Sequence, residues 1–349
     1  MIGVRNWHYK GSILKFGWYR QRKLIPTYLA SRRVLGGKLT DISNTPAAKA
    51  PQKVAVRSLS DGTFAWMLIT PAILFIIVIV AWPLVETVRL SFTDARLGGE
   101  KYVGLENYQD LADSRKFHQT ISRTFFWMFL SVGIKLVLGL IGATLLNAAV
   151  PGKALFRVLV MPPWVIPIAI GMIGWLWLYN GAFGLLSGVM QYVGLVDKPF
   201  EFLAYKQSAF YSAIVADVWV GTPMVTLFLL AAMQGVSRDL YEAAWVDGAG
   251  RWYRFRRITI PQIMPVIVSM ALLSAIWTFN SFEIIWILTE GGPRGATTTL
   301  IVDTYKTAIA NFKFGEGAAR AVVIVFLLAT FSLIYLFFLN KVNKYYGVK

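Results

Sequence analysis

The 349-residue sequence contains no cysteine and only two histidines, His8 and His118. Without cysteine the chain can form neither a disulfide nor a thiolate metal site, and it has no cysteine nucleophile. With two histidines, a histidine metal site or proton relay is not expected either, so we predict no bound metal. Acidic residues are also few: 18 Asp and Glu against 35 Lys and Arg, which gives a net charge of +17.

Motifs of enzymes are absent too. The chain has no G-x-x-x-x-G-K-[ST] sequence, and its nearest run, residues 36–39, lacks the spacing and the hydroxyl that phosphate and magnesium require. No Ser-His-Asp or His-carboxylate set is available for catalysis. We therefore predict that the chain is not itself an enzyme.

Apolar residues dominate what is present, because 56% of the chain is hydrophobic. A helix needs about 20 mostly apolar residues to cross a bilayer. Six stretches meet that length: residues 63–85, 124–150, 158–179, 208–233, 259–288 and 321–340. Pro162, Pro163, Pro167 and Pro223 indicate bends in two of them. The sequence predicts an all-α integral membrane protein with six transmembrane helices.

Lysine and arginine predict the orientation, because cytoplasmic loops carry the positive excess. With both termini inside, the inner segments sum to +17 and the outer segments to +1. Lys135, Asp217 and Glu283 lie within the stretches themselves. The basicity therefore reflects topology and attraction to anionic membrane lipid, and we expect no binding to nucleic acid.

Residues 1–62 hold 12 basic and 2 acidic residues and no long apolar run. This composition predicts a cytoplasmic tail and linker rather than a signal peptide or a span. Within the tail, residues 7–19 fit either an interfacial helix or a loosely held basic segment. Residues 63–340 form the expected transmembrane domain, and residues 341–349 a second cytoplasmic tail.

The loop 237–261, between the fourth and fifth stretches, has the pattern of two short helices. Ser237 is a plausible N-cap, and apolar residues recur after it at helical spacing. Gly248 and Gly250 then permit a sharp turn into a helix that carries four arginines and is expected to stop at Pro261. The pattern predicts a helix-turn-helix at the inner membrane surface.

The spacing within this loop is specific. Glu242-Ala243-Ala244, followed by Gly248, Ile258 and Ile260-Pro261, resembles the EAA loop of bacterial ABC importer permeases, with Ile260 where leucine is common. The two alanines offer a helix face without bulk to a partner's groove, and Glu242 offers a carboxylate for a partner's cation. We identify an ATPase-docking set in this loop: Glu242, Ala243, Ala244, Asp247, Gly248 and Pro261.

Two further segments resemble the carbohydrate-uptake branch of the same family, the maltose and glycerol-3-phosphate permease type. They are VGLENY at residues 103–108 and TEGGP at residues 289–293. The resemblance covers roughly residues 65–341. It implies the type I ABC importer permease fold in the bacterial cytoplasmic (inner) membrane, with both termini inside.

The resemblance also implies a function and partners. A carbohydrate, either an oligosaccharide or a sugar derivative, would enter the cytoplasm by alternating access as the fourth and fifth spans rock with the loop. The partners would be a second, non-identical permease subunit, two ATP-binding-cassette ATPase subunits and an external solute-binding protein. ATP and Mg²⁺ would be bound by the ATPases, and this chain would bind no cofactor.

Charged residues within spans are costly and favour a functional interpretation. Lys135 and Asp217 fall at similar depths, on the order of 15 Å at 1.5 Å per residue, so we hypothesise a buried ion pair that either lines the path or fixes helix packing. Asn280 and Glu283, with the aromatic residues around them, suit a sugar, which uses hydroxyl partners and flat rings. The candidate substrate path comprises Lys135, Asp217, Asn280, Glu283, Trp277, Phe279 and Phe282.

Three alternatives deserve comparison. A non-sugar solute would leave every feature of the docking loop intact. A secondary transporter would usually show internal repeats, which the sequence lacks. A voltage sensor is disfavoured, because the arginines at 251, 254 and 257 lie in a polar loop rather than in an apolar helix.

Overall fold

The computed structural model describes residues 61–148 and 152–346, and these form one compact helical unit. The tail predicted at residues 1–62, including the segment 7–19, lies almost wholly outside the described residues. The described part has no sheet, only isolated bridges such as Thr93 with Tyr102. The all-α class is thereby confirmed.

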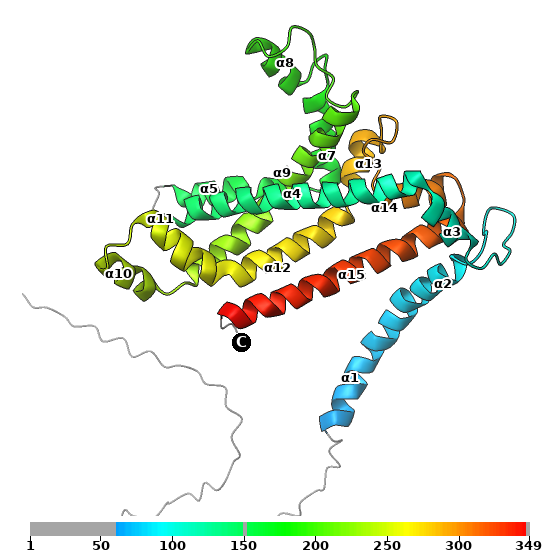
Figure 1. The fold of residues 1–349 in the computed structure, drawn as a ribbon, viewed down its shortest axis with the longest axis horizontal. Coiled ribbons are helices and arrows are strands. Elements are labelled where there is room, and N and C mark those ends of the chain that lie inside the picture. Colours follow the sequence, from blue (N-terminus) through cyan, green and yellow to red (C-terminus); the bar gives the residue numbers. More distant parts are fainter. Residues whose placement is uncertain (1–60, 149–151, 347–349) are drawn as a thin grey trace, which may run out of the picture. The chain divides into compact units, whose positions relative to one another are not determined.

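Five helical segments of the described chain are long and apolar enough to cross a membrane (Figure 1). They are Gly62–Leu90, Arg115–Asn147, Lys206–Gln234, Arg251–Phe279 and Phe314–Val342. The first contains α1 (Asp61–Ile76), a π-helical turn (Ile77–Ala81) and α2 (Trp82–Leu90). The second and third are α4 (Arg115–Asn147) and α9 (Lys206–Gln234), and the last lies within α15 (Phe314–Tyr346).

The third predicted span is broken rather than continuous. It consists of α5 (Lys153–Val160), α6 (Pro162–Val165) and α7 (Ile168–Tyr179), and the part Ala154–Val165 meets α7 at 96°. Pro167 accounts for the break, because a proline disfavours helical backbone at the residue before it. Ile166 accordingly has extended backbone. This bent pair is a sixth candidate span.

The fifth predicted span, residues 259–288, is also interrupted. α12 (Ile260–Phe279) ends at Phe279 with Asn280 as its C-cap, and the short α13 (Glu283–Thr289) begins three residues after Asn280. The break puts Asn280, Ser281 and Glu283 at the junction of the two helices. α7 packs against α13, and both project with α8 (Leu185–Tyr192) from the helical body (Figure 1).

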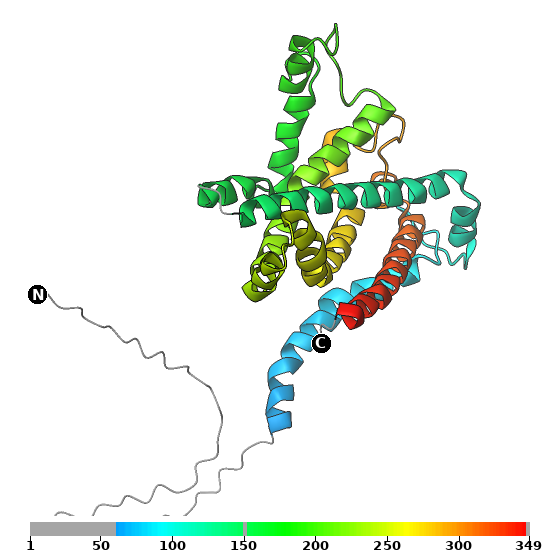
Figure 2. The same ribbon diagram turned by 60° about the vertical axis from the view of Figure 1, so that its left-hand side comes forward.

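The centre of the body is formed by α4, α9 and α12, which pack against one another (Figure 2). α4 and α9 run parallel, since Phe126 contacts Phe210 near one end and Gly142 faces Thr226 further along both helices. The approach is close at Gly139, where a Cβ atom would lie 2.5 Å from the Val225 side chain. Small residues at such crossings let helix backbones meet in a membrane.

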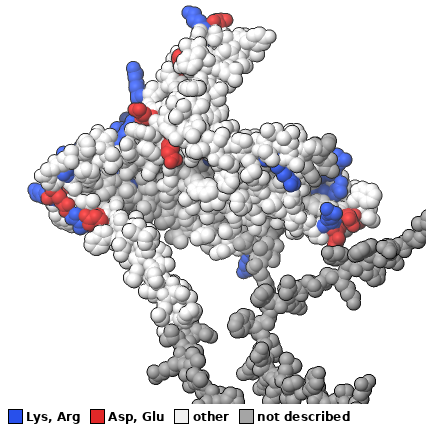
Figure 3. All heavy atoms as spheres, turned by 180° about the vertical axis from the view of Figure 1, so that it is seen from behind, with Lys and Arg blue, Asp and Glu red and all other residues white. Residues whose placement is uncertain are grey.

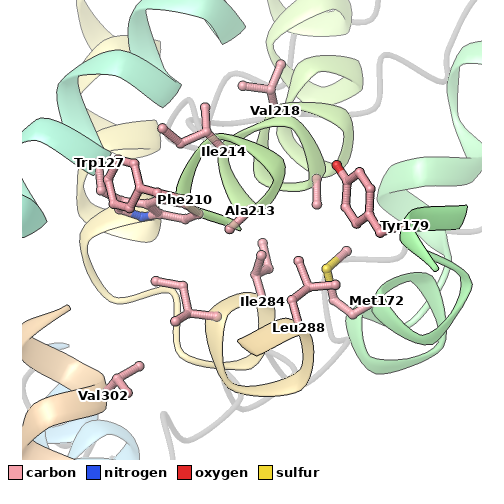
Figure 4. Packing of buried hydrophobic residues seen from close by; sticks show 12 residues of the cluster. Trp127, Met172, Tyr179, Phe210, Ala213, Ile214, Val218, Ile284, Leu288 and Val302 are labelled. Atoms are coloured by element: carbon pink, nitrogen blue, oxygen red, sulfur yellow. The ribbon is translucent and has the colours of Figure 1, made fainter. Parts of the chain in front are cut away.

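Buried apolar side chains join α7, α9 and α13 to this centre. Figure 4 shows the cluster, in which Trp127 of α4 lies beside Phe210 of α9, and Met172 of α7 lies beside Leu288 of α13. The Trp127 indole N–H donates to the Thr278 carbonyl oxygen at 2.9 Å, which ties α4 to α12 as well. The broken third span is therefore anchored at its α7 half.

On the face seen in Figure 3, charged side chains of both signs gather at the two ends of the body and on the projecting part, a few lie between them, and most of the surface is uncharged. α1 and the apolar part of α15 expose aliphatic and aromatic side chains almost all round, including Trp66, Phe75, Phe326 and Phe337. Such surfaces are stable in lipid or against another apolar helix.

The two segments that resemble the carbohydrate branch form folded loop structures. Buried Asn107 donates from Nδ2 to the carbonyl oxygens of Ser91 and Thr93, at 2.9 and 2.8 Å, before α3 (Glu106–Asp113) continues. In the second segment, Thr298 Oγ1 donates to the Gly291 carbonyl at 2.9 Å. α14 (Leu300–Tyr305) then begins with its Leu300 N–H bound to Thr124 of α4.

Candidate translocation site and coupling loop

A cavity of about 440 Å³ opens among α6, α7, α9, α12 and α13, beside Lys135 of α4. Five of the seven predicted path residues line it: Lys135, Asp217, Asn280, Glu283 and Trp277. They come from four different helices or junctions and are brought together by the packing of α4, α9 and α12. A volume of this size is within the range of small-molecule sites.

The predicted ion pair between Lys135 and Asp217 is present at one wall of the cavity. Lys135 Nζ lies 2.7 Å from Asp217 Oδ2, and both residues are 4% exposed. Lys135 also donates to Thr278 Oγ1 at 2.8 Å, so that one ammonium group links α4, α9 and α12. Desolvated charges require such partners, because an isolated charge in an apolar interior is very costly.

Gly221 makes room for this pair. A Cβ atom at Gly221 would lie 2.6 Å from Cε of Lys135 and 3.0 Å from Nζ. The lysine side chain therefore occupies the space that any other residue at position 221 would fill. Sequence reasoning identified the two charges but missed Gly221 and Thr278, because neither residue type signals a charge partner by itself.

The rest of the cavity wall combines polar, aromatic and aliphatic side chains. Asn280, Ser281 and Glu283 line it at the junction of α12 and α13, while Trp164 and Trp277 add indole rings. Asn280 and Glu283 are exposed. Hydroxyl-binding groups beside flat rings are the combination that a sugar can use.

The other two predicted path residues lie elsewhere. Phe279 is buried and meets Phe125 edge to face, with ring centroids 5.6 Å apart. Phe282 stacks on Trp286, with centroids 5.4 Å apart, and packs against Tyr305. Neither ring lines the cavity, because Phe279 packs against Phe125 of α4 and Phe282 packs against Trp286 and Tyr305.

Five of the six predicted docking residues lie in or directly after an exposed helix, α10 (Arg238–Val246), whereas Pro261 lies in the first turn of α12. Ser237 caps α10, since its side chain accepts from the Asp239 N–H at 3.3 Å. Gly248 then has a φ of +76°, a left-handed conformation that glycine adopts without strain, so the sharp turn is confirmed.

The second helix of the loop does not stop at Pro261, contrary to the sequence prediction. α11 (Arg251–Arg254) passes through a π-helical turn (Phe255–Thr259) directly into α12. Proline lacks an N–H group, and its ring clashes with the preceding turn. The wider π turn before it, with Pro261 in the first turn of α12, lets the helix continue.

α10 is held to the body by few polar contacts. The Tyr241 hydroxyl bonds the Thr259 hydroxyl at 2.8 Å. Trp245 and Val246, at 70% and 80% exposed, present apolar surface beside exposed Glu242 and Ala243. An exposed short helix with apolar and acidic groups on its surface is suited to a protein partner.

These features define a class: a multi-span helical membrane protein with a polar cavity between its spans and an exposed loop helix connecting two of the cavity-lining helices. Comparison with known proteins identifies the family. Residues 47–345 match the family described as binding-protein-dependent transport system inner membrane component, and the chain belongs to it. It is a permease subunit of an ABC importer in the inner membrane.

Individual relatives extend the match over most of the chain. A probable ABC transporter permease protein of Brucella suis biovar 1 is 32% identical over 80% of this chain and 97% of its own length. The trehalose/maltose transport system permease protein MalF of Thermococcus litoralis is 34% identical over 79% and 93%. The crystal structure of a bacterial ABC transporter that imports alginate has a chain with the same fold, with a TM-score of 0.72 at 19% identity over 80% of this chain and 96% of that chain.

Proposed function

We propose that this chain moves a carbohydrate, an oligosaccharide or sugar derivative, into the cytoplasm by alternating access. It acts beside a second, non-identical permease subunit, two ATPase subunits that bind ATP and Mg²⁺, and an external solute-binding protein. Both termini lie in the cytoplasm, residues 1–62 and 341–349 are tails, and residues 63–340 form the transmembrane domain. The net charge of +17 on the proposed inner segments supports this orientation.

The choice of a carbohydrate rests on the cavity and on relatives. The MalF relative is named for trehalose and maltose transport. The cavity combines two indole rings with an amide, two serine hydroxyls, a threonine hydroxyl and two carboxylates, of which the one on Asp217 is paired with Lys135. Among the described residues that line the cavity, Lys135 is the one cation and it is already paired with Asp217, so a neutral sugar fits better than an anion.

The observation that carries the coupling proposal is the position of α10 in the chain. It is exposed, and it connects α9 directly to the continuous helix of α11 and α12. α9 and α12 both line the cavity and are joined there through Lys135. A displacement of α10 by a docked ATPase is therefore transmitted to two cavity walls at once. Glu242, Ala243, Ala244, Asp247 and Gly248 form the docking surface, and Pro261 marks the start of the moving span.

Gly248→Trp tests this docking. A Cβ atom at Gly248 would meet nothing within 4 Å inside the chain, so the indole projects from the exposed turn, and the strain of a side chain at a φ of +76° is measured separately by the control below. We expect a tagged Gly248→Trp subunit to insert normally but to co-purify at least tenfold less ATPase and to lose uptake. Full retention of substrate-stimulated ATPase activity and uptake would show that the loop does not dock an ATPase.

The matched control is Gly248→Asn, which separates backbone strain from bulk. Position 248 needs a positive φ, which asparagine adopts more readily than other side chains. We expect Gly248→Asn to keep most of its ATPase partner. Equal losses in both variants would assign the effect to the turn itself rather than to a docked surface.

A further inference from the structure

A second hollow, the α4–α9 groove, lies at the ends where these two parallel helices begin. Its volume is about 610 Å³. It is separate from the translocation cavity and shares no lining residue with it. Residues of α4, α9 and the loop before α14 form its wall: Gln119, Ser122, Arg123, Phe126, Lys206, Gln207, Phe210, Tyr211, Arg294 and Ala296.

The groove concentrates positive charge. Arg123, Lys206 and Arg294 line it, and no acidic residue does. Arg123 is fixed by donating from Nη1 to the Thr298 carbonyl at 2.9 Å. Among the described residues, Lys206 and Arg294 form no ion pair. Lys206 is also the first residue of α9, whose N-terminal dipole favours an anion. The groove therefore suits an anionic group.

Polarity changes along both helices in the same direction. On α4 the lining runs from Gln119 and Arg123 to Phe126, and on α9 from Lys206 to Phe210 and Tyr211. The Phe126 and Phe210 rings stack with centroids 5.9 Å apart, while Phe126 and Tyr211 remain 50% and 51% exposed. A ligand that fits this groove carries its negative charge near the first residues of the two helices and an apolar group nearer the middle of the spans.

The depth of the cations matches that of lipid head groups. Lys135 and Asp217 lie near the middle of their helices. Arg123 precedes Lys135 by twelve residues, or about 18 Å, and Lys206 precedes Asp217 by eleven, or about 17 Å. Half the hydrocarbon thickness of a bilayer is about 15 Å. Arg123 and Lys206 thus fall just beyond the acyl region, whereas Phe126 and Tyr211, nine and six residues before the pair, fall within it, at about 14 and 9 Å from its middle.

We propose that the α4–α9 groove binds the head group of an anionic phospholipid, with its phosphate near Lys206 and Arg294 and an acyl chain along Phe126 and Tyr211. A zwitterionic lipid brings an ammonium group that three cations repel. A soluble anion has no acyl chain to contact the exposed Phe126 and Tyr211 rings. The lipid occupies the seam between α4 and α9, beside the path but outside it.

The test is native mass spectrometry of the intact detergent-solubilised complex titrated with phosphatidylglycerol or phosphatidylcholine. We expect phosphatidylglycerol to bind the wild type at least tenfold more tightly than phosphatidylcholine. Each cation contributes about 1 kcal/mol to binding an anionic lipid, so Lys206→Gln with Arg294→Gln weakens phosphatidylglycerol binding roughly 10- to 30-fold. The control, Lys101→Gln with Lys198→Gln, removes two exposed charges outside the groove and leaves binding unchanged.

Two results would overturn the lipid assignment. The first is equal phosphatidylglycerol binding by the wild type and the Lys206→Gln, Arg294→Gln variant. The second is displacement of bound phosphatidylglycerol by free glycerol phosphate at a concentration as low as that at which added phosphatidylglycerol displaces it. That result would identify a site for soluble anions. A Phe126→Asn variant adds a separate readout: it weakens lipid binding severalfold but leaves any binding of free glycerol phosphate unaffected.

Discussion

Removing either partner of the Lys135–Asp217 pair should destabilise the permease, whereas removing both charges should not. Lys135→Met leaves the Asp217 carboxylate 4% exposed without its cation, which lies 2.7 Å away in the wild type. Breaking a buried pair in this way costs about 3–5 kcal/mol, because an uncompensated charge stays buried. Asp217→Asn is expected to cost a similar amount by leaving the ammonium group with Thr278 alone.

The double variant Lys135→Met, Asp217→Asn contains no buried charge at this position. Replacing a buried pair by neutral groups is often close to neutral, so we expect stability within about 1–2 kcal/mol of wild type. The thermal unfolding midpoint of the purified complex and uptake into proteoliposomes are the two readouts. Each single variant lowers both, and the double variant restores both.

Two outcomes would refute this reasoning. Single variants as stable as wild type would mean that the charges are not buried against each other. A double variant that is stable but transports nothing would mean that the pair contacts the solute, so that its main role is not to fix the packing of α4, α9 and α12. The cycle thereby separates the two roles that the sequence left open.

Three further experiments test the close helix crossing, the substrate path and the orientation. Gly139→Ala should lower the thermal unfolding midpoint of the complex by several degrees, because the new Cβ atom would lie 2.5 Å from a valine of α9. Gly133→Ala, whose Cβ atom would meet nothing within 4 Å, should leave the midpoint unchanged. Equal effects of the two variants would contradict the close helix crossing. Glu283→Gln should leave stability unchanged and raise the KM for uptake roughly three- to tenfold by weakening a charged hydrogen bond to the solute, and an unchanged KM would remove Glu283 from the path. Because the chain has no cysteine, Asp247→Cys and Gly98→Cys each provide a single labelling site. In intact spheroplasts, a membrane-impermeant maleimide should label the cysteine at position 98 and not the one at position 247. The opposite labelling pattern would reverse the proposed orientation.

The positions of the spans were predictable, because every helix that crosses the hydrocarbon core of a bilayer needs about 20 mostly apolar residues. The stretch predicted at residues 208–233 is α9, Lys206–Gln234, within two residues at its start and one at its end. α4 begins nine residues before its predicted stretch, because the polar turns from Arg115 are helical yet carry no hydropathy signal. Hydropathy therefore locates the spans better than it locates the ends of their helices.

Breaks and continuations depended on details that hydropathy does not report. The bend at Pro167 was indicated by the prolines, but its angle of 96° was not. The sequence predicted a continuous span through Asn280 and a helix end at Pro261, and both predictions were wrong. Each outcome depends on local backbone geometry: an interrupted helix at Asn280 and a π turn before Pro261. The break places Asn280, Ser281 and Glu283 at the cavity, and the π turn joins the loop to its span.

The candidate site could be predicted in part for a similar reason. Charged residues in apolar stretches are conspicuous, so Lys135 and Asp217 stood out and their pairing followed from depth. Thr278, Ser274 and Trp164 also line the cavity, but hydroxyls and indoles are common in spans and gave no separate signal. The packing of α12 against α4 and α9 brings Thr278 and Ser274 to the cavity, and the packing of α6 against α9 brings Trp164.

The most direct test of the central claim is uptake by proteoliposomes that contain this chain with its partner permease and ATPases, with the solute-binding protein outside. The account predicts uptake of a carbohydrate that requires ATP in the compartment exposed to α10 and that is abolished by Gly248→Trp. Uptake that continues without ATP, driven by an ion gradient alone and unaffected by Gly248→Trp, would contradict it.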